Sequence, residues 1–508
     1  MDYFIGVDLG TSGTKTVLFD EIGKKISSHT IEYDLIQPQN GWAEQNPADW
    51  WNATVGTIKE VIKKSDVNPS DIKGLGISGQ MHGLVMVDKH GEVLRNSIIW
   101  CDGRTGEECK EITETIGKER LIEITANPAL TGFTAGKILW VRKHEPELYE
   151  QCHQILLPKD YIRYKLTGLY GAEVSDASGT NLLDIAKLEW SKEILDKLNI
   201  SQDLMPKLAN SVDIAGNISE EASKSTGLTV DTIVCYGAGD NASAGIGTGV
   251  VSTGKAFTTI GTSGVVFAHS DEPQIDKQGR VHTFCSAVPN KYTIMSCTLS
   301  AGLSLKWFRD NFCTSEIEVA KYLGKDSYDI VNEGVEKLPI GADKLIFLPY
   351  LMGERSPILD ENARGVFFGL SAIHTKYHMI RAIMEGVMYS QKQCLDVING
   401  MGVFPKEMYA CGGGAKSEFW RQMMADIYNT EVLTVQNEEG PALGVAILAT
   451  VACGKYKNVE SACEVMIKTK SALESNITNH EAYDKFYKLY IKLYPMLKDS
   501  FQELKKIN

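Results

Sequence analysis

The sequence predicts a two-domain α/β protein, and three observations lead to that prediction. The chain has 508 residues, too many for one hydrophobic core and enough for two of about 250 residues each. Residues 3–20 have the pattern of two strands, at 3–7 and 16–19, around a turn rich in glycine and hydroxyl side chains. The same Gly-Thr-Ser-Gly turn recurs at residues 261–264, nearly half a chain later. We therefore expect two related domains with a ligand clamped in the cleft between them.

The first turn has the residue types of a phosphate site. Glycines let backbone N–H groups approach an anion, and Thr and Ser hydroxyls satisfy phosphate oxygens. Asp8 would be out of place beside a bare phosphate, which suggests a bridging Mg²⁺, and Lys15 adds positive charge. The alternative is an ordinary hairpin turn, because Asp, Gly, Ser and Thr all favour turns.

The second copy of the turn lacks these charged groups. Thr259 stands where the first copy has Asp8, and Val266 stands where it has Lys15. Strand-like runs at residues 256–260 and 265–268 flank the second turn. The matching flanks make duplication a better explanation than chance, and two unequal phosphate turns predict a bound nucleotide.

Composition restricts the classes of partner. The formal net charge of −13 argues against nucleic acid or an anionic membrane surface, both of which call for basic patches. The longest apolar run, residues 441–453, is shorter than the roughly 20 residues of a membrane span. A strand that begins at Tyr3 leaves no room for a signal peptide, and 11 cysteines without a C-x-x-C pair indicate reduced thiols. We expect a cytoplasmic protein with a small-molecule substrate.

The first half contains a helix and two candidate sugar-binding segments. Asn46 and Pro47 have the residue types of a helix start, and large apolar residues at helical spacing predict a core face made of Trp51, Val55, Ile58 and Ile62. A strand at 74–78 leads to Gln80, Met81 and His82 and resumes at 84–88. The G-x-G-x-x-G at 74–79 is rejected as a dinucleotide site because no helix follows it.

A further strand is predicted at residues 92–100. Trp100, Asp102 and Arg104 alternate at its end and would point to one side, which suits a polyol. A salt-bridged strand terminus is the alternative interpretation. A lone His82 is more often structural than a ligand, so its role also has a structural alternative. Helices are predicted at 134–144 and 158–166, and the stretch 175–230 indicates only loops and short helices.

The middle and second half supply a candidate base and a nucleoside site. Asp240 follows a strand at 232–236 and precedes a helix, where it is either a catalytic carboxylate facing the cleft or a helix N-cap. Three glycines and Lys416 follow a strand at 408–411 and precede a helix, which would let a base or ribose lie on bare backbone. The chain ends in a helical region, 481–506, predicted to be interrupted at Pro495.

Two extended patterns resemble the FGGY carbohydrate kinases. Residues 132–144 (GFTAGKILWVRKH) resemble the first family signature, and residues 365–370 (GVFFGL) running on to 382–385 (AIME) resemble the second. The likeness extends from Asp8 to residues 441–444. It implies two ribonuclease-H-like domains of the actin, Hsp70 and hexokinase type that flank a catalytic cleft, with an N-terminal domain at 1–245 and a C-terminal domain at 246–508.

The resemblance assigns roles position by position. It makes Asp240 the catalytic base, Asp8 the carboxylate near Mg²⁺, and ATP the phosphoryl donor. The residues expected at the nucleotide are Thr11, Ser12, Thr14, Lys15, Gly261, Thr262, Gly413, Gly414 and Lys416. The residues expected at the sugar are Gln80, Met81, His82, Trp100, Asp102, Arg104, Asp240 and Asn241.

The resemblance also implies a substrate. Met-His at positions 81–82 is typical of D-xylulose kinases, whereas glycerol kinases have Arg-Glu there and a tyrosine at the position of Gly132. We therefore expect transfer to the 5-hydroxyl of D-xylulose, with L-ribulose, gluconate or glycerol as alternatives. Two non-enzymatic alternatives are an Hsp70-like binding module and a sugar sensor. The first would need a separate peptide-binding domain, for which the kinase patterns, extending past residue 440, leave no length. The second would not need both Asp8 and Asp240. Related kinases are often dimers, so a homodimer is one assembly consistent with the resemblance, and the sequence leaves the oligomeric state open.

Overall fold

The computed structural model describes residues 1–507 and divides into two compact units. The first unit consists of residues 1–252, 269–293 and 436–468, and the second of residues 253–268, 294–435 and 469 onwards. Each unit is therefore built from more than one stretch of chain. Among the described residues, no helix combines the length and apolar character that a membrane span requires.

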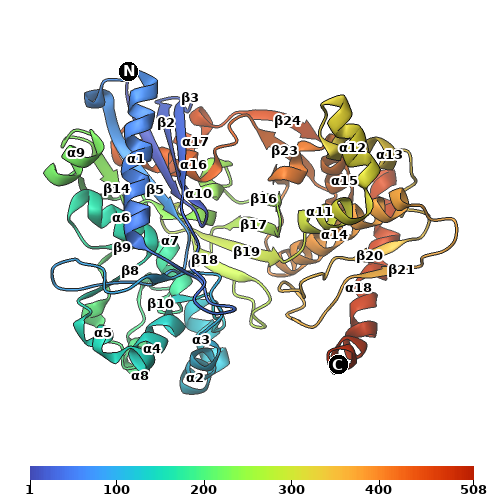
Figure 1. Cartoon of the computed structure of the whole chain (residues 1–508), viewed down its shortest axis with the longest axis horizontal. Coiled ribbons are helices and arrows are strands. Elements are labelled where there is room, and N and C mark those ends of the chain that lie inside the picture. The colour runs from blue at the N-terminus through green and yellow to red at the C-terminus, as the bar shows by residue number, and fades with distance from the viewer. Residues whose placement is uncertain (508) are drawn as a thin grey trace. The chain divides into compact units, whose positions relative to one another are not determined.

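The first unit is organised around a mixed sheet. Its strands run in the order β13-β14-β5-β1-β2-β3, with helices packed against it (Figure 1). The strands of this unit are β1 (Tyr3–Leu9), β2 (Gly13–Asp20), β3 (Lys25–Glu32), β4 (Glu44–Gln45), β5 (Ile72–Gly79), β6 (Val85–Val87), β7 (Ser97–Ile98), β8 (Gln154–Leu156), β9 (Ala172–Glu173), β10 (Leu183–Asp184), β11 (Glu189–Trp190), β12 (Leu208–Ala209), β13 (Ile214–Asn217), β14 (Ile233–Cys235), β15 (Ala238–Gly239) and β18 (His282–Cys285). Its helices are α1 (Pro47–Ser65), α2 (Gly106–Ile116), α3 (Lys118–Thr125), α4 (Thr134–His144), α5 (Pro146–Gln151), α6 (Pro158–Thr167), α7 (Val174–Ala177), α8 (Lys192–Lys197), α9 (Glu220–Thr226), α10 (Asp240–Gly247), α16 (Gly440–Ala452) and α17 (Val459–Met466).

The sheet of the second unit repeats this arrangement. Its strands run β19-β17-β16-β22-β23-β24, and β16 pairs antiparallel with β17 and parallel with β22. In the first unit β1 likewise pairs antiparallel with β2 and parallel with β5. The strands of the second unit are β16 (Lys255–Ile260), β17 (Gly264–Ser270), β19 (Tyr292–Thr298), β20 (Ile346–Leu348), β21 (Val366–Phe368), β22 (Glu407–Cys411), β23 (Glu431–Val435) and β24 (Thr469–Leu473). Its helices are α11 (Gly302–Phe312), α12 (Thr314–Leu323), α13 (Ser327–Val335), α14 (Lys376–Gly400), α15 (Glu418–Tyr428) and α18 (Ile477–Leu504). The shared strand order agrees with the two related domains that the duplicated turn predicts.

Helix α16 lies in the core of the first unit although it comes late in the chain. It packs on β1, β5 and α10 (Figure 1). A Cβ atom on Gly6 would lie 1.9 Å from the Ala442 carbonyl oxygen, so only glycine lets strand and helix approach this closely. This packing accounts for the apolar run at 441–453, which is a buried helix.

Three local predictions need correction. Helix α1 starts at Pro47 with Asn46 as its N-cap, as predicted, but its buried face includes Trp50 and Thr57 and leaves Trp51 only partly buried. The prediction was based on large apolar residues alone and therefore left out the threonines. Thr57 is buried because its Oγ1 lies 2.7 Å from Thr16 Oγ1, which gives the hydroxyl a partner inside the core.

The predicted strand at 92–100 is reduced to β7, because only its two residues pair with β4. Helix α18 runs through Pro495 without interruption, since a proline removes one helical hydrogen bond and the neighbouring turns remain formed. The helices predicted at 134–144 and 158–166 are confirmed as α4 and α6.

Candidate active site

Asp8 and Lys15 lie opposite each other in the β1–β2 hairpin. They are cross-strand partners, so both are strand residues and the turn itself is only residues 10–12. Lys15 and Lys25 both pair with the carboxylate of Glu439, at the start of α16. Burial raises the pKa of Asp8 to about 6, and the nearby Lys15 opposes that rise. The hairpin thus presents one carboxylate of raised pKa beside a lysine.

Side chains from other elements fix the backbone of the turn. The Gly10 carbonyl accepts a hydrogen bond from the Tyr33 hydroxyl (2.5 Å), and the Thr11 carbonyl accepts one from Gln45 Nε2 (2.6 Å). Trp100 Nε1 donates to Thr11 Oγ1 (2.9 Å). Neither Tyr33 nor Gln45 was identified from the sequence, because their roles depend on contacts across the unit.

The predicted nucleotide residues of this turn differ in exposure. Ser12 is exposed and Thr11 is half-buried at the tip, whereas Thr14 is fully buried on β2. Gln80 is also buried, and its Nε2 donates to Gln45 Oε1 (2.8 Å). The geometry therefore offers the hydroxyls of Thr11 and Ser12, rather than that of Thr14, to a ligand outside the turn.

Asp240 is the first residue of α10 and is not its cap. The cap position is Gly239, and no side chain caps the helix. Asp240 Oδ1 instead accepts hydrogen bonds from the backbone N–H (2.7 Å) and the Nδ2 amide (2.9 Å) of Asn241. Burial and the charge of Asp8 raise the pKa of Asp240 to about 7. A carboxyl group with a pKa near the working pH is suited to accept a proton.

Met81 and His82 follow β5 and lie next to the start of α10. A Cβ atom on Gly239 would lie 2.9 Å from Met81 Cγ, so the Met81 side chain packs directly against the residue before Asp240. The His82 ring stacks on Phe133, with centroids 4.4 Å apart, and its Nδ1 lies 2.6 Å from the Gly179 carbonyl. The structure thus brings the predicted sugar motif and the predicted base together.

His82 has a left-handed backbone (φ 68°) that a buried lysine supports. Lys137 Nζ donates to the carbonyls of His82 (2.8 Å) and Gly132 (2.7 Å), and Thr134 Oγ1 donates to that of His82 (3.1 Å). Burial lowers the pKa of Lys137 to about 7. Sequence reasoning missed this contact, although Lys137 lies within the first signature.

Aromatic residues from a distant segment complete this region. Phe284 and His282 on β18 lie within 6.2 Å of Phe133, measured between ring centroids. His282 Nδ1 lies 2.8 Å from Asn127 Oδ1. No pattern around residue 282 indicated this placement.

Asp102 and Arg104 pair with each other. Their side chains are buried, Arg104 Nη2 lies 2.7 Å from Asp102 Oδ2, and the guanidinium lies 3.7 Å from the centroid of Trp42. Arg104 Nη1 also lies 2.8 Å from Glu44 Oε1. These contacts agree with the salt-bridged alternative, and a role of either residue at the sugar stays a prediction. Trp100 is exposed, and these residues lie beyond β7 rather than on a strand.

In the second unit, the turn at residues 261–264 joins β16 to β17. The backbone N–H of Gly302, at the start of α11, donates to the Gly261 carbonyl (2.7 Å), and that of Ala301 donates to the Thr262 carbonyl (3.0 Å). Gly413 and Gly414 belong to a short 3₁₀ turn, Gly413–Lys416, after β22. Gly413 and Lys416 are exposed, and no atom lies within 4 Å of a Cβ placed on Gly413. This backbone is open to a flat ligand.

The duplicated fold, the phosphate-type hairpin and the raised-pKa carboxylate define an ATP-dependent phosphotransferase of the actin and hexokinase type. Models of the N-terminal and C-terminal domains of the FGGY family of carbohydrate kinases match residues 3–247 and 256–453. The chain belongs to the FGGY family of carbohydrate kinases.

Individual relatives match along nearly the whole chain. A xylulose kinase of Bacillus subtilis is 41% identical over 505 residues, which is 99% of each chain. A gluconokinase of the same organism is 33% identical over 469 residues, 92% of this chain and 91% of its own. The crystal structure of a ligand-bound xylulose kinase from Lactobacillus acidophilus has a TM-score of 0.91 at 29% identity, covering 99% of this chain and all of the other.

Proposed function

We propose that the protein is a xylulose kinase that transfers the γ-phosphate of ATP to the 5-hydroxyl of D-xylulose, giving D-xylulose 5-phosphate and ADP. The observation that carries the proposal is the packing of Met81 against Gly239, which places the Met-His motif beside Asp240. Full-length similarity to a protein named xylulose kinase supports the same substrate.

Asp240 acts as the general base. A sugar hydroxyl has a pKa far above 7, so a positioned carboxylate must take its proton as the bond to phosphorus forms, which contributes roughly 10² to 10⁴ in rate. Burial and Asp8 bring the pKa of Asp240 to about 7, so about half of the base is ionised at pH 7 and the ionised form is basic enough to accept a proton. Asn241 orients the carboxylate through its two donors.

Asp8 is the proposed ligand of Mg²⁺. Its carboxylate and that of Asp240 repel each other, and a nearby cation would relieve that repulsion. Mg²⁺ is commonly held by one or two carboxylates plus substrate phosphates, so the donor set fits the ion. When bound, Mg²⁺ neutralises charge on the phosphate oxygens.

Other residues bind the two substrates. We assign the phosphates to Thr11, Ser12, Lys15 and the backbone of residues 261–262, with Thr14 as a buried support. Gly413, Gly414 and Lys416 are assigned to the nucleoside. His82 and Met81 are assigned to the sugar, and Trp100 offers an exposed ring for stacking. Gln80, Asp102 and Arg104 act mainly by fixing the backbone around them. We place the reaction in the cytoplasm and expect a homodimer.

Gluconate is the alternative substrate with specific support, because a relative named gluconokinase is 33% identical. The test is a coupled ADP-release assay with D-xylulose, L-ribulose, gluconate and glycerol at matched concentrations. D-xylulose should give the highest kcat/KM, and analysis of the product should locate phosphate on the 5-hydroxyl. Faster turnover of gluconate or glycerol would refute the substrate and leave the kinase assignment intact.

A further inference from the structure

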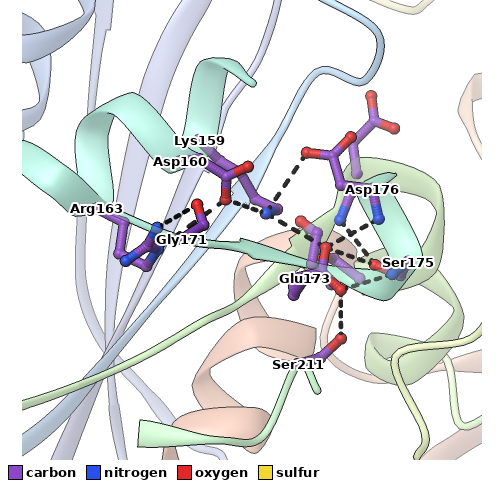
Figure 2. Close-up of polar contacts among 12 residues, drawn as sticks. Lys159, Asp160, Arg163, Gly171, Glu173, Ser175, Asp176 and Ser211 are labelled. Atoms are coloured by element: carbon purple, nitrogen blue, oxygen red, sulfur yellow. Dashed lines mark hydrogen bonds and ion pairs between the residues drawn. The ribbon is translucent and has the colours of Figure 1, made fainter. Parts of the chain in front are cut away.

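A group of charged side chains is fully buried in the first unit, close to Asp240. Its members are Lys159, Asp160, Arg163, Glu173 and Asp176, none of which has measurable solvent exposure (Figure 2). Lys159 Nζ lies 2.7 Å from Asp160 Oδ1 and 3.3 Å from Glu173 Oε1. Burial opposes its charge, but the three carboxylates raise the pKa of Lys159, so the lysine is a cation. Well-packed apolar residues often replace such buried charged groups without loss of stability, so stability alone does not explain this group.

Glu173 is the most highly connected member of this group. Its carboxylate accepts hydrogen bonds from the backbone N–H groups of Ser175 (2.7 Å) and Asp176 (2.9 Å), at the start of α7. It also accepts hydrogen bonds from the hydroxyls of Ser175 (2.9 Å) and Ser211 (2.8 Å) (Figure 2). With Lys159 beside it, every direction around the carboxylate is taken, which fixes both serines.

Both serines hold the segment that leads into Asp240. The backbone N–H of Gly239 donates to Ser175 Oγ (3.2 Å), and the backbone N–H of Gly237 donates to the Ser211 carbonyl (3.1 Å). Gly237 has a left-handed backbone (φ 75°) and no room for a Cβ, so this segment has one tightly defined path. Glu173 is therefore linked to Gly239 through Ser175 and to Gly237 through Ser211. These are two of the three residues that precede Asp240.

The same segment pairs with the strand that leads to the Met-His motif. Strand β15 pairs parallel with β5, with Ala238 opposite Ser78 and Gly239 opposite Gly79. The strand end before Asp240 is thus held by β5 and by the serines that Glu173 orders. Removing the serine contacts would leave it to β5 and to the Ser243 hydroxyl, which donates to the Ala238 carbonyl (3.2 Å).

We propose that Glu173 is a positioning residue that acts through Ser175 and Ser211 to fix the strand end from which Asp240 enters the active site. Glu173 contacts neither sugar nor nucleotide in this scheme. Its effect is on kcat, because a base displaced by about 1 Å can cost 10²-fold in rate. The proposal rests on the proposed role of Asp240.

The test uses Ser175→Ala, which deletes the hydroxyl that joins Glu173 to Gly239. We expect kcat to fall at least tenfold, with the KM values for D-xylulose and ATP within twofold of wild type. Ser191→Ala is the matched control, because Ser191 is also buried and also accepts one backbone N–H, that of Ile194 (3.3 Å), at the start of α8. It should lose comparable thermal stability and keep its kcat.

A double-mutant cycle with Asp240→Asn separates positioning from general damage. If Ser175 acts through Asp240, adding Ser175→Ala to Asp240→Asn lowers kcat no further. A further tenfold loss in the double variant, or equal kcat for Ser175→Ala and Ser191→Ala, would overturn the proposal. A raised KM for D-xylulose at unchanged kcat would also overturn it, since β5 would then be the element affected. If Asp240→Asn alone keeps wild-type turnover, the proposed role of Asp240 as general base is wrong. This outcome does not depend on the Ser175→Ala result, so the two failures can be told apart.

Glu173→Gln provides a second variant that keeps the size of the side chain. Donors converge on both carboxylate oxygens, and the NH2 group that replaces one of them cannot accept, so we expect a loss of kcat at least as large as that of Ser175→Ala. Unchanged kcat in a folded Glu173→Gln protein would contradict the proposal.

Discussion

The carboxylate of Asp8 lies close enough to Asp240 to raise its pKa, so the proposed metal ligand and the proposed base also destabilise each other. Asp8 stands on β1 and Asp240 begins α10, elements separated by more than 200 residues of sequence. Burial is the larger cause of the raised pKa at both positions. The two carboxylates therefore carry a free-energy cost, which a role in catalysis would explain.

Asp240→Asn should abolish most activity and stabilise the fold. The amide keeps the shape of the side chain and still accepts from Asn241, but it cannot take a proton, so kcat should fall by roughly 10² or more. The pKa of Asp240 is raised to about 7 in the folded protein, so its ionisation destabilises the fold increasingly from about pH 4 to pH 7 and fully above pH 7. The variant should therefore melt at a higher temperature than wild type at pH 8, with a gain that vanishes towards pH 4.

Two measurements check this prediction, and Asp231→Asn, an exposed aspartate of the same unit, is the control. Steady-state kinetics should show the loss of kcat, and melting curves between pH 4 and pH 8 should show the gain in Tm for Asp240→Asn alone. Turnover within a fewfold of wild type would mean that another group is the base.

Asp8→Ala should weaken the use of Mg²⁺. The carboxylate is the one acidic group that the first hairpin carries where the second has a threonine, and its loss should raise the Mg²⁺ concentration needed for half-maximal rate and lower kcat. The KM for the sugar should change little, because Asp8 lies on the phosphate hairpin. A titration of rate against Mg²⁺ measures this, with Thr259→Ala at the equivalent position of the second hairpin as the control. An unchanged Mg²⁺ dependence in Asp8→Ala would place the ion elsewhere.

His82→Ala should lower kcat/KM for D-xylulose by an amount equivalent to about 2 kcal/mol or more of transition-state stabilisation. The reason is that the substrate group that hydrogen-bonds to the imidazole is left unpaired when the ring is removed. The slow hydrolysis of ATP without sugar should change much less. The imidazole also stacks on Phe133, so His82→Phe serves as a second variant that keeps an aromatic ring and removes the polar atoms. If His82→Phe retains wild-type kcat/KM, the ring contributes only packing.

Local patterns in the sequence were enough to predict the elements that carry the site. The hairpin of Asp8, the strand before Met81 and the helix at Asp240 were predicted because strand periodicity, glycines and turn residues are local signals. Helix α4 was predicted with its observed bounds. The duplicated turn also predicted two related domains, and the two sheets share a strand order.

Contacts across the fold could not be predicted in the same way. Ser175 and Gly239 are 64 residues apart, and nothing in either neighbourhood indicates that they meet. The buried face of α1 was misjudged because Thr57 satisfies its hydroxyl inside the core, where a hydrophobic pattern expects no polar residue. Lys137 was noted only as part of the first family signature. The sequence around a lysine on an apolar helix does not indicate which backbone carbonyls its amino group will contact.

Lys137 leads to the last prediction, which concerns sugar affinity. Its amino group donates to the carbonyls of His82 and Gly132, and so holds the left-handed turn that presents the Met-His motif. Lys137→Met keeps the length of the side chain and leaves both part-buried carbonyls without that donor, so only the Thr134 hydroxyl still donates to His82 and the turn should be held less tightly. We expect the KM for D-xylulose to rise at least tenfold while the KM for ATP stays within twofold.

The control for this prediction is Lys143→Met on the same helix, where the lysine is exposed and pairs with Glu108. Because Lys143 is exposed and lies at the opposite end of α4 from the carbonyls that Lys137 meets, this variant should keep wild-type kinetics. The test is to measure the KM for D-xylulose and the KM for ATP in both variants. Equal sugar KM values for Lys137→Met and wild type would show that β5 and the stacked Phe133 hold His82 without help from the lysine. A parallel rise in both KM values would instead indicate general disruption of the unit, because a donor to the His82 turn has no reason to change ATP binding.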